Sequence, residues 1–574
     1  MCTSVVAQTD NSRASADATA ANATYSQGIA ALQQRDLAGA RAAFEKTIKL
    51  VPRSPEPHNS LGWVLLALGE TDAAIAEFKT TLRLDPNFAQ AHMNFSRALL
   101  QKGDASGAVR EARESVRLAP SDSETHHILG QALSNSGDAA GAVAELENAI
   151  ELEPNRPELH DDLGSVLVQQ LKTTEAAAEF SEALKLEPQF ALAHLHLGVL
   201  RLQQRQISEA ETELRAAVNL DPESSLIHYY LGQALEVEGS ADSALQEYEA
   251  SARLDPLNAD AQKHLGILLQ RSGNADEALS AFRQVVKLRP DSPDAHNDLG
   301  LALLQTGDAA SSLSEFQIAL KFKPNDAGYH ANLGAAYLQK TDFDAAVDHF
   351  QSAIKLAPQD AAFHYDLGLA LKMKDRLPEA IAELKKAAEL DPKLADAYYT
   401  LGVTLWQQGE FAAAAEQLRA AIQAKPDYAE AYYTLGSVLK QKGDSQSAAD
   451  ALREAIRLQP DFAGAHTNLG AVLRQLGDAE GAAAESRAGM ELLKQRSNEQ
   501  AAMFSTNSGK RLLNAGDLDG AISQFRSALQ SLPNYAPAHY QLALALQRKG
   551  SKEEALKEFQ RAAELDPHYK MPGQ

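Results

Sequence analysis

The sequence PEPHNSLGWVLLALGETDAAIAEFKTTLRLDPNF, residues 55–88, is one copy of a pattern that recurs along almost the whole chain. Its clearest marker is a proline that returns every 34 residues, thirteen times in succession. These prolines are Pro52, Pro86, Pro120, Pro154, Pro188, Pro222, Pro256, Pro290, Pro324, Pro358, Pro392, Pro426 and Pro460. A fixed period of this length indicates a chain built by stacking one small structural unit.

Four other residue types recur at fixed distances before each proline. A glycine, usually after a leucine, stands 24 residues before it, and an alanine stands 12 before it. An aromatic residue often stands 8 before it and a small residue 5 before it. For Pro86 these are Gly62, Ala74, Phe78 and Thr81. Small residues at fixed places allow two helix backbones to approach closely, and the large ones fill the space beside them.

Each repeat predicts two amphipathic helices. Over residues 55–68 the apolar residues recur at near-helical spacing, at Leu61, Trp63, Leu65, Leu66 and Leu68. Gly69 ends this first helix, because glycine adopts the left-handed conformation without penalty. The second helix ends at Asp85-Pro86, because proline cannot donate the next hydrogen bond and disfavours helix in the residue before it.

The length, the two-helix form and the places of the Leu-Gly, Ala, aromatic and Pro residues resemble the tetratricopeptide repeat. Sixteen repeats can be placed, fourteen without a break over 21–496 and two more over 502–535 and 536–569. The resemblance implies an all-α fold, a right-handed superhelix (α-solenoid) of sixteen helix pairs. A short insertion, 497–501, and a tail, 570–574, lie outside the repeats.

Two segments interrupt this regularity. Residues 1–20 are small, polar and aperiodic, so we expect them to be disordered. At 497–501, five extra residues follow Lys494, which stands where the proline is expected. This insertion is either part of a longer helix that shifts the register or a hinge before the last two repeats; the longer helix is the favoured alternative.

Composition limits the classes of partner. The net charge of −23 opposes nucleic acid as the main partner, because an acidic solenoid repels the phosphate backbone. No apolar stretch is long enough to span a membrane. Cys2 is the only cysteine, which excludes an internal disulfide. Cytoplasmic localisation is the default; residues 1–8 would instead indicate a periplasmic or secreted protein if they are the end of an incomplete signal peptide.

Histidine recurs at one place in the repeat, which raises the question of a metal site. The set is His58, His92, His126, His160, His194, His228, His296, His330, His364, His466 and His539. Equivalent residues on stacked helices lie about 8–10 Å apart, too far to share one zinc ion. We therefore expect these histidines to be structural. With no catalytic motif in the repeats, the sequence predicts no catalytic residues, no cofactor and no metal.

In tetratricopeptide arrays the first helix of each repeat lines the concave groove, and the resemblance points to the places three before, one after and four after the glycine. In the eleventh to fourteenth repeats these places hold aromatic and cationic residues that suit a peptide with acidic or carboxylate groups. The candidate groove residues are Tyr365, Lys372, Tyr399, Trp406, Tyr433, Lys440 and Arg474. The alternative is that the aromatic residues only pack on neighbouring repeats.

The predicted function is a non-enzymatic protein–protein interaction scaffold that holds a partner segment in its groove. The alternative is a recognition or assembly arm of a larger enzyme or of a secretion complex. The inner face is partly similar to the arm of O-linked N-acetylglucosamine transferases, whose asparagine ladder is matched at Asn94, Asn332, Asn468 and Asn507. The transferase domain itself is not in this sequence. No polar capping helix follows Pro567 in the sequence, which indicates either a truncation or end-to-end self-association through the last repeat.

Overall fold

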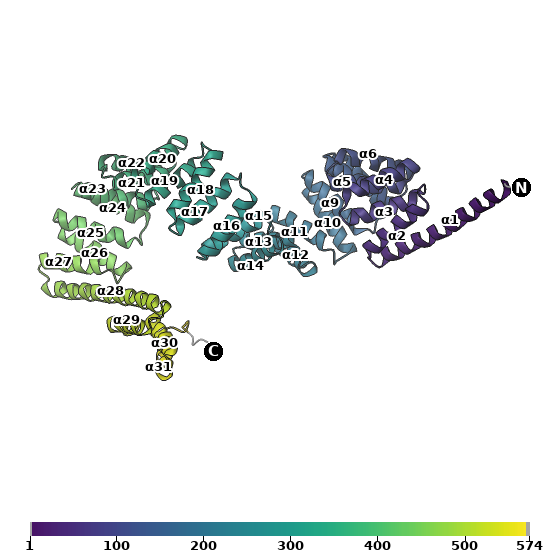
Figure 1. The fold of residues 1–574 in the computed structure, drawn as a ribbon. Coiled ribbons are helices and arrows are strands. Elements are labelled where there is room, and N and C mark those ends of the chain that lie inside the picture. The colour runs from purple at the N-terminus through teal and green to yellow at the C-terminus, as the bar shows by residue number, and fades with distance from the viewer. Residues whose placement is uncertain (1–2, 570–574) are drawn as a thin grey trace. The chain divides into compact units, whose positions relative to one another are not determined.

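The computed structural model describes residues 3–569 of the 574-residue chain, all of it helices and short connections in that range. The chain divides into two compact units, Met1–Pro290 and Asp291–Gln574. In each unit, successive helices pack as antiparallel neighbours along the chain, as the ribbon in Figure 1 shows. The all-α repeat architecture predicted from the 34-residue period is confirmed.

The N-terminal unit contains sixteen of the described helices. They are α1 (Thr3–Gln33), α2 (Leu37–Leu50), α3 (Pro55–Ala67), α4 (Thr71–Leu84), α5 (Ala89–Lys102), α6 (Ala105–Leu118), α7 (Ser123–Ser136), α8 (Ala139–Leu152), α9 (Pro157–Gln169), α10 (Thr173–Leu186), α11 (Ala191–Gln203), α12 (Ile207–Leu220), α13 (Ser225–Glu238), α14 (Ala241–Leu254), α15 (Ala259–Arg271) and α16 (Ala275–Leu288).

The C-terminal unit contains the other fifteen described helices. They are α17 (Pro293–Gln305), α18 (Ala309–Phe322), α19 (Ala327–Gln339), α20 (Phe343–Leu356), α21 (Ala361–Met373), α22 (Leu377–Leu390), α23 (Ala395–Gln407), α24 (Phe411–Ala424), α25 (Ala429–Lys442), α26 (Ser445–Leu458), α27 (Ala463–Gln475), α28 (Ala479–Asn514), α29 (Leu518–Ser531), α30 (Ala536–Lys549) and α31 (Lys552–Leu565).

The two helices of each repeat meet at the recurring glycine. In the fifth repeat, a Cβ atom added to Gly164 would lie 2.6 Å from the ring of Phe180, which is fully buried. The third repeat has Ser96 in place of the glycine, and there the facing residue is the small Ala112. Ser96 is itself buried and donates a hydrogen bond to the carbonyl oxygen of Ala108. The size of one residue is thus matched to the size of the other.

The recurring histidine ties the two helices of a repeat together by a second contact. Its Nδ1 lies 2.5–2.7 Å from the carboxylate of a glutamate nineteen residues later. Ten such pairs are present in the described residues: His58–Glu77, His92–Glu111, His126–Glu145, His160–Glu179, His194–Glu213, His228–Glu247, His296–Glu315, His364–Glu383, His466–Glu485 and His539–Glu558.

The other ring nitrogen also faces an acceptor. In His92, Nε2 lies 3.0 Å from the carbonyl oxygen of Pro86, six residues earlier. Both ring nitrogens donate hydrogen bonds only in the charged imidazolium, so this geometry favours that form. Burial lowers the pKa of His92, but the bonds to Glu111 and Pro86 together outweigh it, and the net pKa is raised. The recurring proline therefore ends one helix and also accepts a bond from the next repeat.

Two segments bear on the expected repeat boundaries. Helix α1 begins at Thr3, within residues 1–20, for which the sequence predicts disorder. Residues 3–27 lack glycine and proline and contain many alanines, the residue with the highest helix propensity. At 497–501 the helix α28 continues without a break, in agreement with the longer-helix alternative. The tail 570–574 lies outside the described residues.

A search of the described helices for membrane spans finds none that is both long and apolar enough to cross a bilayer.

The first prediction concerns the glycine contact. We expect Gly164→Ser to destabilise the chain by about 1–3 kcal/mol, because the new side chain overlaps the ring of Phe180. The double variant Gly164→Ser/Phe180→Ala recreates the pair found in the third repeat and should lose less than the sum of the two single variants. Urea unfolding of all four proteins measures the coupling; strictly additive losses would contradict this account.

The second prediction concerns pH. Because the pKa of His92 is raised in the folded chain, its stabilising contribution is complete below the unfolded value of about 6.5. The contribution is lost as the pH rises through the folded value. Glu111→Gln should therefore lower the pKa of His92, and the part of the stability that depends on the pH through His92 should become smaller. Histidine C2–H exchange followed by mass spectrometry measures the pKa, with Glu223→Gln, an exposed carboxylate, as the control. An unchanged pKa would rule out the pair as its cause.

Candidate functional site

The candidate groove residues lie on the first helices of four successive repeats in the C-terminal unit. Tyr365 and Lys372 are on α21, Tyr399 and Trp406 on α23, Tyr433 and Lys440 on α25, and Arg474 on α27. Within each of the first three helices, the aromatic residue and the residue seven positions later fall on one face, since seven residues make about two turns. We call these seven residues the groove patch.

Two tyrosines of the patch also pack on the residue just before the first helix of the next repeat. The ring of Tyr399 lies 5.0 Å from that of Tyr428, and the ring of Tyr433 lies 4.6 Å from that of Phe462. Both tyrosines are only half-buried, so part of each side chain remains accessible. Burial also raises the pKa of Tyr365. Each ring therefore stiffens the junction between repeats and still presents surface to a ligand.

Polar contacts fix two further patch residues, Trp406 and Lys440. Trp406 donates a hydrogen bond from Nε1 to Oε1 of Gln441, at 2.8 Å. Lys440 donates from Nζ to Oδ1 of Asn468, at 3.3 Å. Asn468 in turn donates to Ser437 Oγ at 3.0 Å. These bonds join α23 to α25 and α25 to α27, so Trp406 and Lys440 are held in place before any ligand arrives.

Lys372 differs from the other cations of the patch. Its side chain is half-buried, and it makes no hydrogen bond or ion pair with the described residues. Burial lowers its pKa, because the ammonium loses hydration without gaining a counterion. An anionic group of a ligand would supply the missing counterion. Arg474, by contrast, is exposed to solvent.

Asp366, next to Tyr365, is a half-buried carboxyl that the sequence analysis did not single out. Burial, helped by the negative charge of Asp360, raises its pKa to about 6. No hydrogen bond or ion pair of its side chain offsets the burial among the described residues. The only signal in the sequence is its place, two residues before the glycine, where other repeats carry asparagine or histidine.

The N-terminal unit has a buried polar network that the sequence analysis also missed. Asp162 accepts hydrogen bonds from Gln131 at 2.7 Å and from Nε2 of His127 at 2.6 Å. Asp161, almost fully buried, pairs with His196 Nδ1 at 2.9 Å. The histidine and aspartate partners are 35 residues apart, one repeat plus one residue, and that spacing was the available signal.

Asparagines form the same kind of contact between repeats. Asn94 donates to Asn59 at 3.2 Å, and Asn332 donates to Asn297 at 2.8 Å, in both cases 35 residues away. In these pairs the amide group of one asparagine is engaged by the asparagine of the preceding repeat. The pairs therefore link repeats to each other.

A serine near this network raises the possibility of a nucleophile. Ser165 Oγ lies 3.5 Å from His196 Nδ1, the same nitrogen that faces Asp161. A catalytic triad needs the nucleophile on one ring nitrogen and the carboxylate on the other. The arrangement therefore cannot activate Ser165. A search of the described residues for clustered metal ligands likewise finds no group of three or more.

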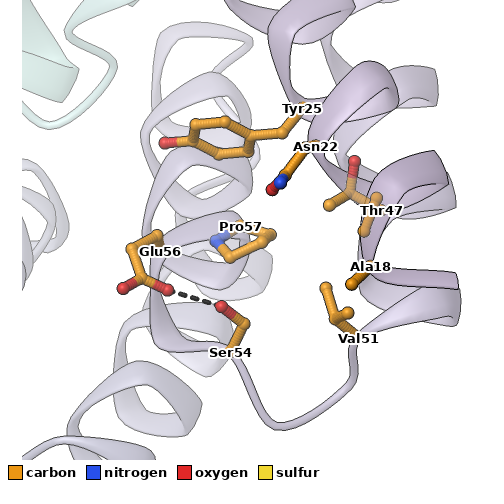
Figure 2. A pocket seen from close by; sticks show the side chains of 9 residues that line it. Ala18, Asn22, Tyr25, Thr47, Val51, Ser54, Glu56 and Pro57 are labelled. Atoms are coloured by element: carbon orange, nitrogen blue, oxygen red, sulfur yellow. Dashed lines mark hydrogen bonds between the residues drawn. The ribbon is translucent and has the colours of Figure 1, made fainter. Parts of the chain in front are cut away.

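Figure 2 shows a cavity of about 350 Å³ where α1, α2 and the start of α3 meet. It is lined by Ala18, Ala21, Asn22, Tyr25, Thr47, Val51, Ser54, Glu56 and Pro57. Ser54 Oγ donates to the carboxylate of Glu56 at 2.5 Å, as the dashed line marks. The nine lining residues include no cation, so this cavity suits an acidic segment less well than the groove patch does.

The third prediction concerns Asp366. Because its pKa is raised, the ionised carboxyl destabilises the folded chain, and stability rises as the pH falls from about 6 towards 4. Asp366→Asn should stabilise the chain by about 1–3 kcal/mol at pH 7–8 and have little effect at pH 4. Thermal unfolding at both pH values measures this, with the exposed Asp427→Asn as control. An equal effect at both pH values would exclude titration of Asp366 as the cause.

Comparison with solved structures finds several repeat proteins at low similarity. "Crystal structure of APC/C hetero-tetramer Cut9-Hcn1" is 15% identical and covers 79% of this chain and 96% of its own, with a TM-score of 0.37. The MamA crystal structure is 29% identical over 29% of this chain and 96% of MamA, with a TM-score of 0.28. PilF of Pseudomonas aeruginosa is 20% identical over 38% of this chain and 97% of PilF, with a TM-score of 0.34. No curated protein sequence matches the chain.

Family comparison covers almost the whole chain. The tetratricopeptide repeat pattern matches residues 10–56, 59–123, 129–189, 162–218, 197–259, 264–327, 399–453, 433–488 and 506–570. A second TPR repeat pattern matches 337–375 and 373–409. The matched segments lie along the repeated helix pairs described above, with some of their limits inside helices. The chain therefore belongs to the tetratricopeptide repeat family.

Proposed function

We propose that this chain is a non-enzymatic scaffold that binds a protein segment along the groove patch of its C-terminal unit. Tetratricopeptide repeats are generally protein-interaction scaffolds and are typically non-catalytic. The main support for placing the binding site at the groove patch is Lys372. This half-buried cation has no counterion among the described residues. A carboxylate from the partner would pair with it, while Tyr365, two turns earlier on the same helix, supplies an apolar surface.

The partner segment is one that carries an acidic group near apolar or aromatic side chains. The half-buried rings of Tyr399, Tyr433 and Trp406 offer flat surfaces that lose little conformational entropy on binding. Lys440 and Arg474 extend the positive charge along α25 and α27. Because Trp406 and Lys440 are already fixed by contacts between repeats, ordering these two side chains on binding costs little.

The fourth prediction tests this site with peptides. Random peptides displayed on phage are selected on the full chain, and the enriched sequences are synthesised with a fluorescent label. We expect enrichment of acidic residues next to apolar ones, and Tyr399→Ala/Trp406→Ala should weaken binding by about 2 kcal/mol, roughly 30-fold, in fluorescence anisotropy. Lys372→Met should weaken only peptides that contain a carboxylate at the selected place.

Trp63→Ala is the matched control, because Trp63 and Trp406 are the two tryptophans of the chain and Trp63 lies on α3 of the other unit. Circular dichroism confirms that each variant keeps its helices. Binding that Trp63→Ala weakens and the groove variants leave unchanged would place the site elsewhere and refute the proposal.

A further inference from the structure

Helix α28 is longer than a helix of a regular repeat. It has 36 residues, and it contains the second helix of the fourteenth repeat, the insertion 497–501 and the first helix of the fifteenth repeat. Its first half packs on α27, where Gly470 faces Ser486, and its second half packs on α29, where Gly509 faces Phe525. Figure 1 shows α28 as one uninterrupted rod.

A regular junction between repeats buries a defined set of apolar side chains. At the next junction, between the fifteenth and sixteenth repeats, Leu529 and Leu532 near the end of α29 pack with Ala538, near the start of α30. The chain reverses direction between these helices, so the end of one lies against the start of the next. The same contact recurs at Ala388 and Ala397, between α22 and α23.

The equivalent residues in α28 are not covered. Met490 and Leu493 stand where Leu529 and Leu532 stand one repeat later, and Phe504 stands where Ala538 stands. They are 61%, 51% and 70% exposed. Met490 and Phe504 are fourteen residues apart on one continuous helix, about 21 Å along its axis, so they cannot reach each other within the chain. Both halves of a repeat junction are thus left open.

We propose that two copies of this chain close these junctions reciprocally, with their α28 helices antiparallel about a two-fold axis at Ser497. Met490 lies seven residues before Ser497 and Phe504 seven after it. In an antiparallel pair, Met490 of each copy then faces Phe504 of the other, twice by symmetry. The exposed surface at Met490 and the exposed surface at Phe504 would normally pack on each other, and both are present in every copy of the chain. A second copy is therefore the partner that fits both surfaces.

The spacing and charges of the stretch fit this pairing. Residues 490, 493, 497, 500 and 504 alternate by three and four, which puts them on one side of a helix, as in an antiparallel coiled coil. Ser497, exposed and small, allows close approach at the axis. Glu499 of one copy falls opposite residues 494–496 of the other, which include Lys494 and Arg496. The segment is therefore complementary to itself in charge as well as in apolar surface.

The fifth prediction is a crosslink between different chains. In a Cys2→Ser background, one preparation carries Met490→Cys and another, with a distinguishable tag, carries Phe504→Cys. Equal amounts are mixed under mild oxidation. We expect a disulfide between the two differently tagged chains, because facing residues in the dimer bring their Cα atoms within the range a disulfide requires. Met373→Cys, a comparably exposed position on α21, replaces Met490→Cys in the control mixture and should not crosslink.

The state of association gives a second readout. Light scattering after size exclusion should show a dimer for the natural chain, and Phe504→Glu should weaken dimerisation by at least tenfold. Leu476→Glu, at another exposed leucine in the same unit, is the control and should leave the dimer intact. A monomer at all concentrations, or an intrachain disulfide in a monomeric Met490→Cys/Phe504→Cys variant, would overturn the proposal; the latter would mean that the chain folds back on itself.

Discussion

The close approach of the two helices in each repeat is the constraint on which the rest of the structure depends. At Gly164 and its counterparts the facing aromatic or leucine side chain occupies the space where a Cβ atom would stand. This contact fixes how far the second helix lies from the first, and therefore where the next repeat begins. Where the glycine is replaced, as at Ser96, the facing residue shrinks to Ala112 and the spacing is kept.

Most of the polar residues that look functional serve this stacking. The histidine–glutamate pairs join the helices within a repeat, and the pairs 35 residues apart join one repeat to the next. A polar group used in this way is already satisfied and gains little from a ligand. Within residues 3–569, Lys372 and Asp366 have no such partner and therefore differ from that background; both lie on α21. Whether a polar side chain already has a hydrogen-bond or ion-pair partner within the repeats is thus a better guide to function than its residue type.

The sequence predicts the periodic part of the structure and misses what periodicity does not contain. Gly62, Ala74 and Pro86 mark the helices because each has a backbone or packing role that few residues can fill. The partner of His92 was missed, although Glu111 stands at a constant distance, because no single repeat reveals the pairing. Helix α1 runs through residues whose polar composition predicts disorder, although their many alanines favour helix. The placing of the groove patch on first helices follows from the repeat, but which members are uncompensated depends on three-dimensional burial.

Helix α28 follows from the loss of one residue type. In regular repeats the proline prevents the second helix from continuing, so the chain turns and the next repeat folds back on it. Lys494 stands in place of that proline in the fourteenth repeat, and neither proline nor glycine occurs between Met490 and Phe504. Helix is then the favoured conformation through the insertion, and the turn that would bury Met490 against Phe504 is lost. The same change that straightens the backbone exposes the two surfaces, so the long helix and the exposure of Met490 and Phe504 have one cause.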